Sequence, residues 1–298
     1  MALIGDAPSI TVVTVVKNDL KGLQVTLASV LIQSSQNFEW LIIDGYSKDG
    51  TSELGLDLAQ KNLARMIPVP PKGIYHAMNQ GILNATGDFI VFLNAGDFFV
   101  SQNSIETIEL LLKTHHQSLV FPVIQINSKG QAIDIALPTL ISLGSRQILD
   151  ANHQGFVMKK SASELSGNFD LSLDFAADGK LMDGVVSIDG VTLDSTILTA
   201  FVIGGASSLN ISKTLKEIGT YRGNPTNKFY IWKTSITTVL RNSAFEKKFF
   251  AARILELLLV RRAKSRVRVK LMNCQELEHW HDRSDSIPNY SCCLGLRS

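Results

Sequence analysis

The sequence predicts an α/β domain with a mainly parallel central sheet flanked by helices, and three observations support this prediction. Short β-branched and apolar runs alternate with stretches whose apolar residues recur at helical spacing. Apolar residues make up 45% of the 298 residues and charged residues 19%, so the chain can bury a large core. Polar residues follow directly after three of the expected strands, where a parallel sheet binds ligands.

The alternation is clearest in the first 113 residues. Residues 10–16 form a continuous β-branched run, and the next stretch places Leu23, Leu27 and Leu31 at helical spacing. A break rich in Pro and Gly over 68–73 separates two later helices. The elements expected here are strand Ile10–Val16, helix Leu20–Gln33, strand Trp40–Asp44, helix Thr51–Leu63, helix Ile74–Ala85, strand Phe89–Leu93 and helix Ser104–Lys113.

The pattern is less regular after residue 130. The elements expected there are strand Gly155–Lys159, helix Asp174–Met182 and strand Ser195–Ile203, followed by a turn of small residues over 204–208. From Phe229 the sequence is typical of helix, and residues 271–298 lose periodicity. We therefore expect a helical C-terminal extension with a loosely ordered end.

The net charge of +2 hides two regions of opposite charge. Residues 1–220 hold 14 basic and 21 acidic side chains, a net charge of −7, whereas residues 221–298 hold 15 and 6, a net charge of +9. The average therefore does not indicate a nucleic-acid-binding protein. The acidic body and the basic tail need separate explanations.

The ends and the cysteines predict a cytoplasmic protein. The N-terminus lacks the basic, apolar and small-residue pattern of an export signal, and no run of about 18 apolar residues free of charge is present. Cys274, Cys292 and Cys293 lack Cys-x-x-Cys spacing, so neither a disulfide framework nor a zinc module is indicated.

Three polar turns follow the expected strands. They contain Lys17-Asn18, the run from Asp44 to Thr51, and the run from Asn94 to Asp97. One such turn is more easily explained by turn chemistry or by helix capping than by function. Three at one edge of a sheet favour a binding cleft.

Four segments, at residues 44–51, 72–82, 85–88 and 92–97, occur in an order that resembles the family 2 glycosyltransferases, especially bacterial enzymes that build surface polysaccharide or lipopolysaccharide. The resemblance covers roughly residues 8–207. It implies a nucleotide-diphospho-sugar transferase fold of GT-A type as the catalytic domain over 1–220. The donor-binding half would span about 8–125 and the acceptor half about 126–220, followed by the basic extension over 221–298.

The resemblance implies a nucleoside diphosphate sugar donor, often linked to UDP. Thr14 and Val16 would line the nucleoside pocket, and Asp44 would accept a hydrogen bond from an N–H such as that of uracil N3. Gly73 would let the backbone approach the ligand, and Asn79 would face the donor. The full donor-binding set implied is Thr14, Val16, Asp44, Gly45, Ser47, Asp49, Gly73, Asn79 and Asn94.

A divalent cation, Mg²⁺ or Mn²⁺, is implied as cofactor, because it neutralises the diphosphate leaving group. The family usually supplies an acidic pair or Asp-x-Asp, whereas this sequence supplies Asn94-Ala95-Gly96-Asp97. Asp97 is then the sole carboxylate ligand. One carboxylate suffices where water and phosphate oxygens complete the coordination. The structural alternative for Asp97 is a helix cap or a turn residue.

The family pattern places the catalytic base at Asp178. Asp174 would lie one helical turn earlier and raise the pKa of Asp178 by repulsion, although either carboxylate could equally be solvated. His153 and Gln154 resemble a segment on the acceptor side, where His153 would position the acceptor or approach the diphosphate. Gly205 lies in a small-residue turn that resembles one closing the family's site.

The basic tail between Arg241 and Lys270 holds ten basic and two acidic residues, with aromatic and aliphatic residues at roughly helical spacing. An amphipathic basic helix of this kind binds anionic membrane surfaces. A helix packed on the catalytic domain with a solvated basic face is the alternative. RNA binding is disfavoured because the aromatic residues are not interleaved with the charges.

We expect an inverting glycosyltransferase that adds a sugar to a glycan or lipid-linked acceptor of the cell envelope, at the inner face of the cytoplasmic membrane. A sugar nucleotidyltransferase is one alternative, but it would need a basic phosphate-binding loop where residues 13–18 offer only Lys17. A non-catalytic nucleotide-binding scaffold is another, suggested by the reduced metal motif.

Overall fold

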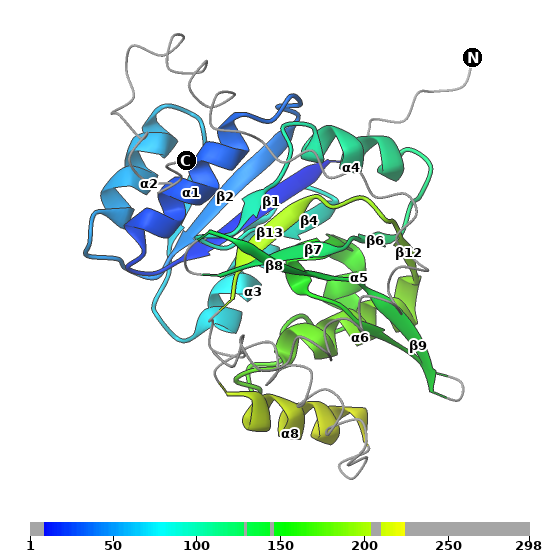
Figure 1. Cartoon of the computed structure of the whole chain (residues 1–298). Coiled ribbons are helices and arrows are strands. Elements are labelled where there is room, and N and C mark those ends of the chain that lie inside the picture. The colour runs from blue at the N-terminus through cyan, green and yellow to red at the C-terminus, as the bar shows by residue number, and fades with distance from the viewer. Residues whose placement is uncertain (1–8, 128–129, 144–145, 204–209, 224–298) are drawn as a thin grey trace.

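The structure is a computed structural model that describes residues 9–127, 130–143, 146–203 and 210–223 (Figure 1). Its strands are β1 Ile10–Val16, β2 Phe38–Asp44, β3 Arg65–Pro68, β4 Phe89–Phe92, β5 Phe98–Phe99, β6 Ser118–Val120, β7 Val123–Ile126, β8 Ala132–Ala136, β9 Thr139–Leu143, β10 Arg146–Asp150, β11 Phe156–Lys159, β12 Val191–Leu193 and β13 Thr199–Val202. Its helices are α1 Leu20–Leu31, α2 Thr51–Gln60, α3 Ile74–Asn84, α4 Ser104–Leu112, α5 Lys160–Leu165, α6 Ala177–Asp189, α8 Ile211–Arg222 and the 3₁₀ turn η1 His153–Gly155.

The central sheet has seven strands in the order β12-β6-β11-β4-β1-β2-β3. Strands β4, β1, β2 and β3 pair in parallel, as do β12 and β6, whereas β11 runs antiparallel to both of its neighbours. The prediction of a mainly parallel sheet flanked by helices is thereby confirmed. Two smaller sheets are present as well, a hairpin of β9 and β10 and a four-stranded sheet in the order β5-β13-β7-β8.

Helices cover both faces of the central sheet (Figure 1). Neighbouring strand residues divide between the faces: Val12 and Ile42 pack with α1, α2 and α4, while Val13 and Ile43 pack with α3, α5 and α6. Because both faces are covered, the inner strands are mostly β-branched and apolar and do not alternate regularly with polar residues. This explains why the sequence signal for β1 and β2 is so clear.

The expected elements of the first half are confirmed to within a few residues at their ends. The second half differs more. The helix expected from Asp174 begins at Ala177, and the strand expected from Ser195 begins at Thr199. In addition, the short strands β6, β7, β8, β9, β10 and β12, and β3 in the first half, were not expected. Strands of three to five residues carry too few positions for a periodic signal.

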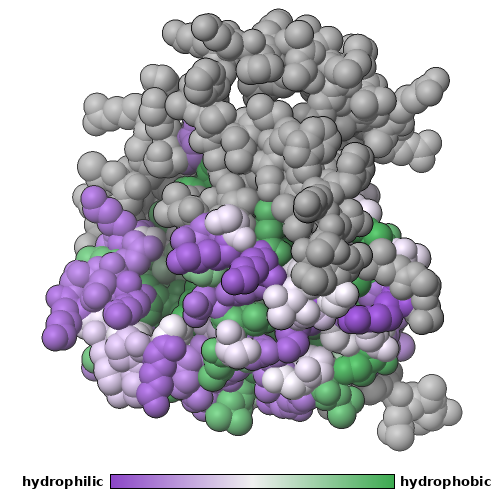
Figure 2. Space-filling model, turned by 90° about the horizontal axis from the view of Figure 1, so that it is seen from below, coloured by the Kyte–Doolittle hydropathy of each residue, from purple (hydrophilic) through white to green (hydrophobic). Residues whose placement is uncertain are grey.

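The face seen from below in Figure 2 mixes hydrophilic and hydrophobic side chains over its described part. No helix among the described residues combines the length and apolar character required to cross a bilayer.

Candidate active site

The candidate site lies at the carboxyl edge of β4, β1 and β2, which are neighbours in the sheet. These strands run parallel, so the loops that follow them emerge on the same side. The chain order reverses here, because β2 lies on one side of β1 and β4 on the other. Such a reversal opens a crevice in which α/β proteins bind ligands. The three polar turns therefore share one edge, as predicted.

Asp178, the predicted base, lies in the first turn of α6 and contacts three donors. His153 Nδ1 is 3.2 Å from Asp178 Oδ2, the Gly179 amide donates to Oδ1 over 2.9 Å, and the Tyr75 hydroxyl lies 3.4 Å from Oδ1. Oδ2 therefore keeps a lone pair beyond the one that faces His153. The side chains of Asp178 and His153 are 27% and 21% exposed, so a ligand can reach them.

His153 joins this carboxylate to the edge of the sheet. Its Nε2 is 3.3 Å from Asn94 Nδ2, and Asn94 lies in the turn that follows β4. With its proton on Nδ1, the imidazole donates to Asp178 and accepts from Asn94, so one neutral tautomer satisfies both contacts. Three segments far apart in the sequence, the turn after β4, η1 and α6, thus converge on one site.

The pKa of Asp178 is held below its ordinary value. Burial acts to raise this pKa, but the hydrogen bond and charge of His153, together with the Gly179 amide and Tyr75, outweigh it. The pKa of His153 is raised in turn, because the hydrogen bond and charge of Asp178 and the charge of Asp97 outweigh the lowering effect of burial. Asp178 is therefore ionised at neutral pH, which is the form that accepts a proton.

The prediction that Asp174 raises the pKa of Asp178 is wrong. Asp174 precedes the first residue of α6, so it does not occupy the preceding turn of the same helix. Its side chain is exposed, and its backbone N–H donates to Glu217 over 3.1 Å. Asp174 and Asp178 are spaced as neighbours on a helix would be, but they do not lie on one helix, because the helix starts later than the sequence pattern indicates.

Asp97, the predicted metal ligand, is only 7% exposed beside the same site. Burial raises its pKa to about 7, against the lowering effects of the His153 charge and of Gln154, whose Nε2 lies 3.3 Å from Asp97 Oδ2. Thr199 on β13 in turn donates to the Gln154 carbonyl over 2.8 Å. The small sheet therefore holds Gln154 against Asp97.

The oxygen atoms at this turn fit a divalent cation. Asn94 Oδ1 is buried and has no hydrogen-bond partner, and the Asp97 carboxylate lies three residues further along the same turn. Amide and carboxylate oxygens are the donors that Mg²⁺ and Mn²⁺ prefer. In the described part of the chain no three His, Cys, Asp or Glu side chains cluster as a metal site, so a cation here would also need phosphate or water oxygens.

Thr14 and Val16 lie in the core, and the prediction that they line a nucleoside pocket does not hold for their side chains. Thr14 is 0% exposed, and its hydroxyl donates to the Leu93 carbonyl over 2.8 Å and accepts from Trp40 Nε1 over 2.9 Å. Val16 is 3% exposed and packs with Leu23. Strand residues buried under helices on both faces leave no side-chain surface for a ligand.

Asp44 is enclosed by its own loop. It is 1% exposed, and it accepts hydrogen bonds from the Ser47 hydroxyl over 2.5 Å and from the Ser52 hydroxyl over 2.6 Å. In this conformation the carboxylate organises the loop after β2. A bond from a nucleobase to Asp44, as predicted, would require one of these hydroxyls to move away.

The contacts of Ser47 and Asp49 and the surroundings of Gly45 fit turn chemistry and helix capping, which the sequence left open as the alternative to ligand binding. The Ser47 hydroxyl accepts from the Asn18 amide over 2.7 Å, which ties the loops after β1 and β2 together. Asp49 accepts from the Leu20 amide over 3.0 Å at the start of α1. A Cβ added at Gly45 would lie 3.0 Å from Cβ of the Lys17 side chain.

Asn79 is bonded to the segment before α6, and its role facing the donor stays a prediction. Its amide donates to the Phe169 carbonyl and accepts from the Phe169 N–H, each over 2.9 Å, so both ends of the side chain are occupied. Gly73 has a φ of 104° and open space where a Cβ would stand, so its role in close ligand approach stays a prediction. Gly205 lies outside the described residues.

Tyr75 and Glu217 contact this region although the sequence did not single them out. Tyr75 stacks on Phe169 with ring centroids 5.5 Å apart, and its hydroxyl faces Asp178. Tyr75 stands inside the segment 72–82 that resembles the family, and this was the only signal available for it. Glu217 gave none.

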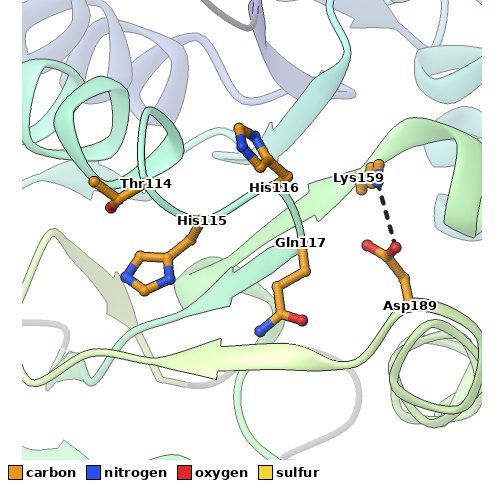
Figure 3. Close-up of a pocket in the computed structure, with 6 residues that line it drawn as sticks. All are labelled: Thr114, His115, His116, Gln117, Lys159 and Asp189. Atoms are coloured by element: carbon orange, nitrogen blue, oxygen red, sulfur yellow. Dashed lines mark hydrogen bonds and ion pairs between the residues drawn. The ribbon is translucent and has the colours of Figure 1, made fainter.

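A hollow of about 370 Å³ lies elsewhere, at the amino end of β6 (Figure 3). The imidazoles of His115 and His116 point in different directions there, and Lys159 Nζ lies 3.3 Å from Asp189 Oδ1. Because β6 runs in the same direction as β4, this hollow is at the opposite edge from the candidate site. The two histidines therefore do not contribute to that site.

The family profile for glycosyl transferase family 2 matches residues 11–152. An uncharacterised glycosyltransferase of Mycobacterium tuberculosis is 32% identical over 181 residues, which cover 58% of this chain but only 66% of the relative, just under two thirds of its length. S. aureus TarS in complex with UDP-GlcNAc superposes with a TM-score of 0.58 at 14% identity, over 79% of this chain and 73% of that one. Mannosyltransferase PcManGT from Pyrobaculum calidifontis, in complex with GDP-Man and Mn²⁺, gives 0.54 at 11% identity over 93% and 84%. The two structures show a shared GT-A fold, and the profile identifies residues 11–152 as a family 2 glycosyltransferase domain.

Proposed function

We propose that this chain is an inverting glycosyltransferase that moves a sugar from a UDP-linked donor to a hydroxyl of a glycan or lipid-linked acceptor in cell-envelope polysaccharide biosynthesis. The observation that carries the proposal is the chain of contacts from Asn94 through His153 to Asp178. It sets an ionised carboxylate beside the sheet edge where α/β folds bind nucleotides. The structural relatives in complex with UDP-GlcNAc and GDP-Man support a nucleotide-sugar donor.

Asp178 supplies the base. Inversion requires a base on the face of the sugar opposite the leaving group, within hydrogen-bond reach of the acceptor hydroxyl. The unoccupied lone pair of Asp178 Oδ2 accepts the hydroxyl proton as the hydroxyl oxygen bonds to the anomeric carbon. The bond from that carbon to the diphosphate oxygen breaks, and the nucleoside diphosphate leaves with the electron pair. His153 and the Gly179 amide fix the orientation of the carboxylate, and the Tyr75 hydroxyl lies against its Oδ1 atom.

Asn94 and Asp97 would hold a divalent cation, Mg²⁺ or Mn²⁺. When bound, the cation supplies positive charge for the diphosphate leaving group. Gln154 orients the Asp97 carboxylate through the contact with Oδ2. A carboxylate whose pKa is raised to about 7 by burial gains from a nearby cation, because the cation favours its ionised form.

The acceptor is proposed to reach the site from an anionic membrane surface. This part rests on the sequence of residues 241–270, which lie outside the described residues, and on their ten basic side chains.

The test is release of nucleoside diphosphate from UDP-GlcNAc, UDP-glucose and GDP-mannose by the full chain, with and without Mn²⁺. We expect turnover of at least one donor and a rate about 10²–10⁴-fold lower in Asp178→Asn, with nucleotide binding retained. Asp174→Asn is the matched control, because that exposed carboxylate lies just before the same helix. Nucleotide binding without turnover of any donor would favour the scaffold alternative.

A further inference from the structure

Helix α6, which carries the candidate base, begins without a cap of its own. Its N-cap residue is Ala176, which has no side-chain acceptor. Helix N-termini leave N–H groups that need acceptors, and alanine is among the poorest N-cap residues. Glu217 on α8 supplies one acceptor, because it receives the amide of the N-cap residue Ala176 over 3.0 Å. It also receives the amides of Asp174 and Phe175, just before the helix, over 3.1 and 2.9 Å.

A second contact joins the same two helices further along α6. Arg222 Nε donates to Asp183 Oδ2 over 2.9 Å, and the Leu149 amide donates to Asp183 Oδ1 over 2.9 Å. The side chains of Arg222 and Asp183 are 11% and 3% exposed, so this ion pair is buried. Removing one partner of a buried, hydrogen-bonded pair leaves an uncompensated charge, and the contact is therefore difficult to break.

The two contacts lie on either side of Asp178 in the sequence. Glu217 holds the residues just before α6, and Arg222 holds Asp183, five residues after the candidate base. Helix α8 lies directly beside α6 in Figure 1, and it lies beyond residues 11–152, where the family profile matches. A shift of α6 along or about its axis would move Asp178 relative to His153, which is held on a different segment.

We infer that Glu217 is a positioning residue that places Asp178 by capping α6 from α8, with Arg222 as the second attachment. The inference rests on the proposed function, in which Asp178 is the base. Glu217 itself touches only backbone amides ahead of the helix, so it acts through the position of Asp178. Its negative charge also suits the positive end of the α6 dipole.

The test compares Glu217→Ala and Glu217→Gln in the full chain with Lys216→Ala, an exposed neighbour on the same helix. The donor is the nucleotide sugar that the wild-type chain turns over fastest in the panel above. We expect Glu217→Ala to lower kcat by roughly 10–100-fold with the donor KM nearly unchanged, because misplacement of a catalytic group affects the chemical step. Glu217→Gln should recover part of kcat, since its amide oxygen still accepts from the backbone.

Amide hydrogen exchange of residues 174–176 gives a readout that does not depend on activity. These three amides should exchange faster in Glu217→Ala than in the wild type and in Lys216→Ala. An active wild type whose Glu217→Ala variant keeps its kcat, or whose three amides stay protected, would overturn the inference alone. A wild type that turns over no donor would overturn the proposed function first, and the inference with it.

Discussion

His153 controls the protonation state of the candidate base more than any other single residue. Burial alone would raise the pKa of Asp178, and the hydrogen bond and charge of His153 are the main effects that lower it. A residue with this role is hard to recognise in sequence, where an isolated histidine is more often a structural side chain. Its two contacts, to Asp178 and to Asn94, identify it here.

Replacing His153 should change the pH dependence of the reaction. A base with a lowered pKa stays ionised above that pKa and loses activity only as the pH falls through it. In His153→Ala the pKa of Asp178 rises, so the acidic limb of kcat moves to higher pH. His153→Asn, which keeps a neutral donor near the position of Nδ1, should shift the limb less. Identical acidic limbs in wild type and His153→Ala would contradict this role.

Asp97 should account for the metal response. Asp97→Ala is expected to abolish stimulation by Mn²⁺, because it removes the one carboxylate of the turn after β4. Asn94→Asp is the matched gain-of-ligand variant and should lower the Mn²⁺ concentration needed for half-maximal rate. The measurement is a Mn²⁺ titration of nucleoside diphosphate release. An unchanged titration in Asp97→Ala would show that the cation binds elsewhere.

At the scale of elements, α3 is joined to the segment before α6 by the side chain of Asn79. The two bonds to Phe169 connect residues 90 positions apart. They also keep the Phe169 ring against Tyr75, whose hydroxyl faces Asp178. These bonds could not be expected from the sequence, because local spacing does not say which distant segment packs against a helix. The role of Asn79 toward the donor stays a prediction.

Asn79→Ala should lower the free energy of unfolding by about 1–3 kcal/mol, because it leaves the buried Phe169 N–H and carbonyl without partners. Leu83→Ala is the control on the same helix, since Leu83 is 70% exposed, and it should change the free energy by less than about 0.5 kcal/mol. Urea unfolding of both variants measures the difference. Equal stabilities would mean that water replaces the lost bonds.

At the scale of the whole molecule, the charges are unevenly distributed between an acidic body, residues 1–220, and a basic tail, residues 221–298. The net charge of −7 over residues 1–220 gives the body no attraction to an anionic surface, so membrane binding would have to come from the tail. Each basic residue near such a surface contributes about 1 kcal/mol. The tail remains a prediction, since residues 224–298 lie outside the described residues.

The full chain should sediment with vesicles that contain anionic phospholipid at low salt and should do so less at high salt, because salt screens the attraction. A triple variant, with Arg261, Arg262 and Lys264 changed to Gln, should bind more weakly under the same conditions. Binding that ignores the anionic lipid content would contradict the electrostatic explanation.

The sequence by itself determined the class of fold, the edge of the sheet where polar residues collect, and the resemblance of residues 11–152 to family 2 glycosyltransferases. These properties depend on local periodicity, on turn chemistry and on short motifs, and each of these features involves residues close together in the sequence. Only the tertiary structure decided how the polar atoms pair. It shows Asp44 enclosed by Ser47 and Ser52, Asp178 joined to His153, and α6 capped by Glu217. Partners such as Glu217 and Ala176 lie 41 residues apart, and which donor meets which acceptor at that distance depends on how whole elements pack.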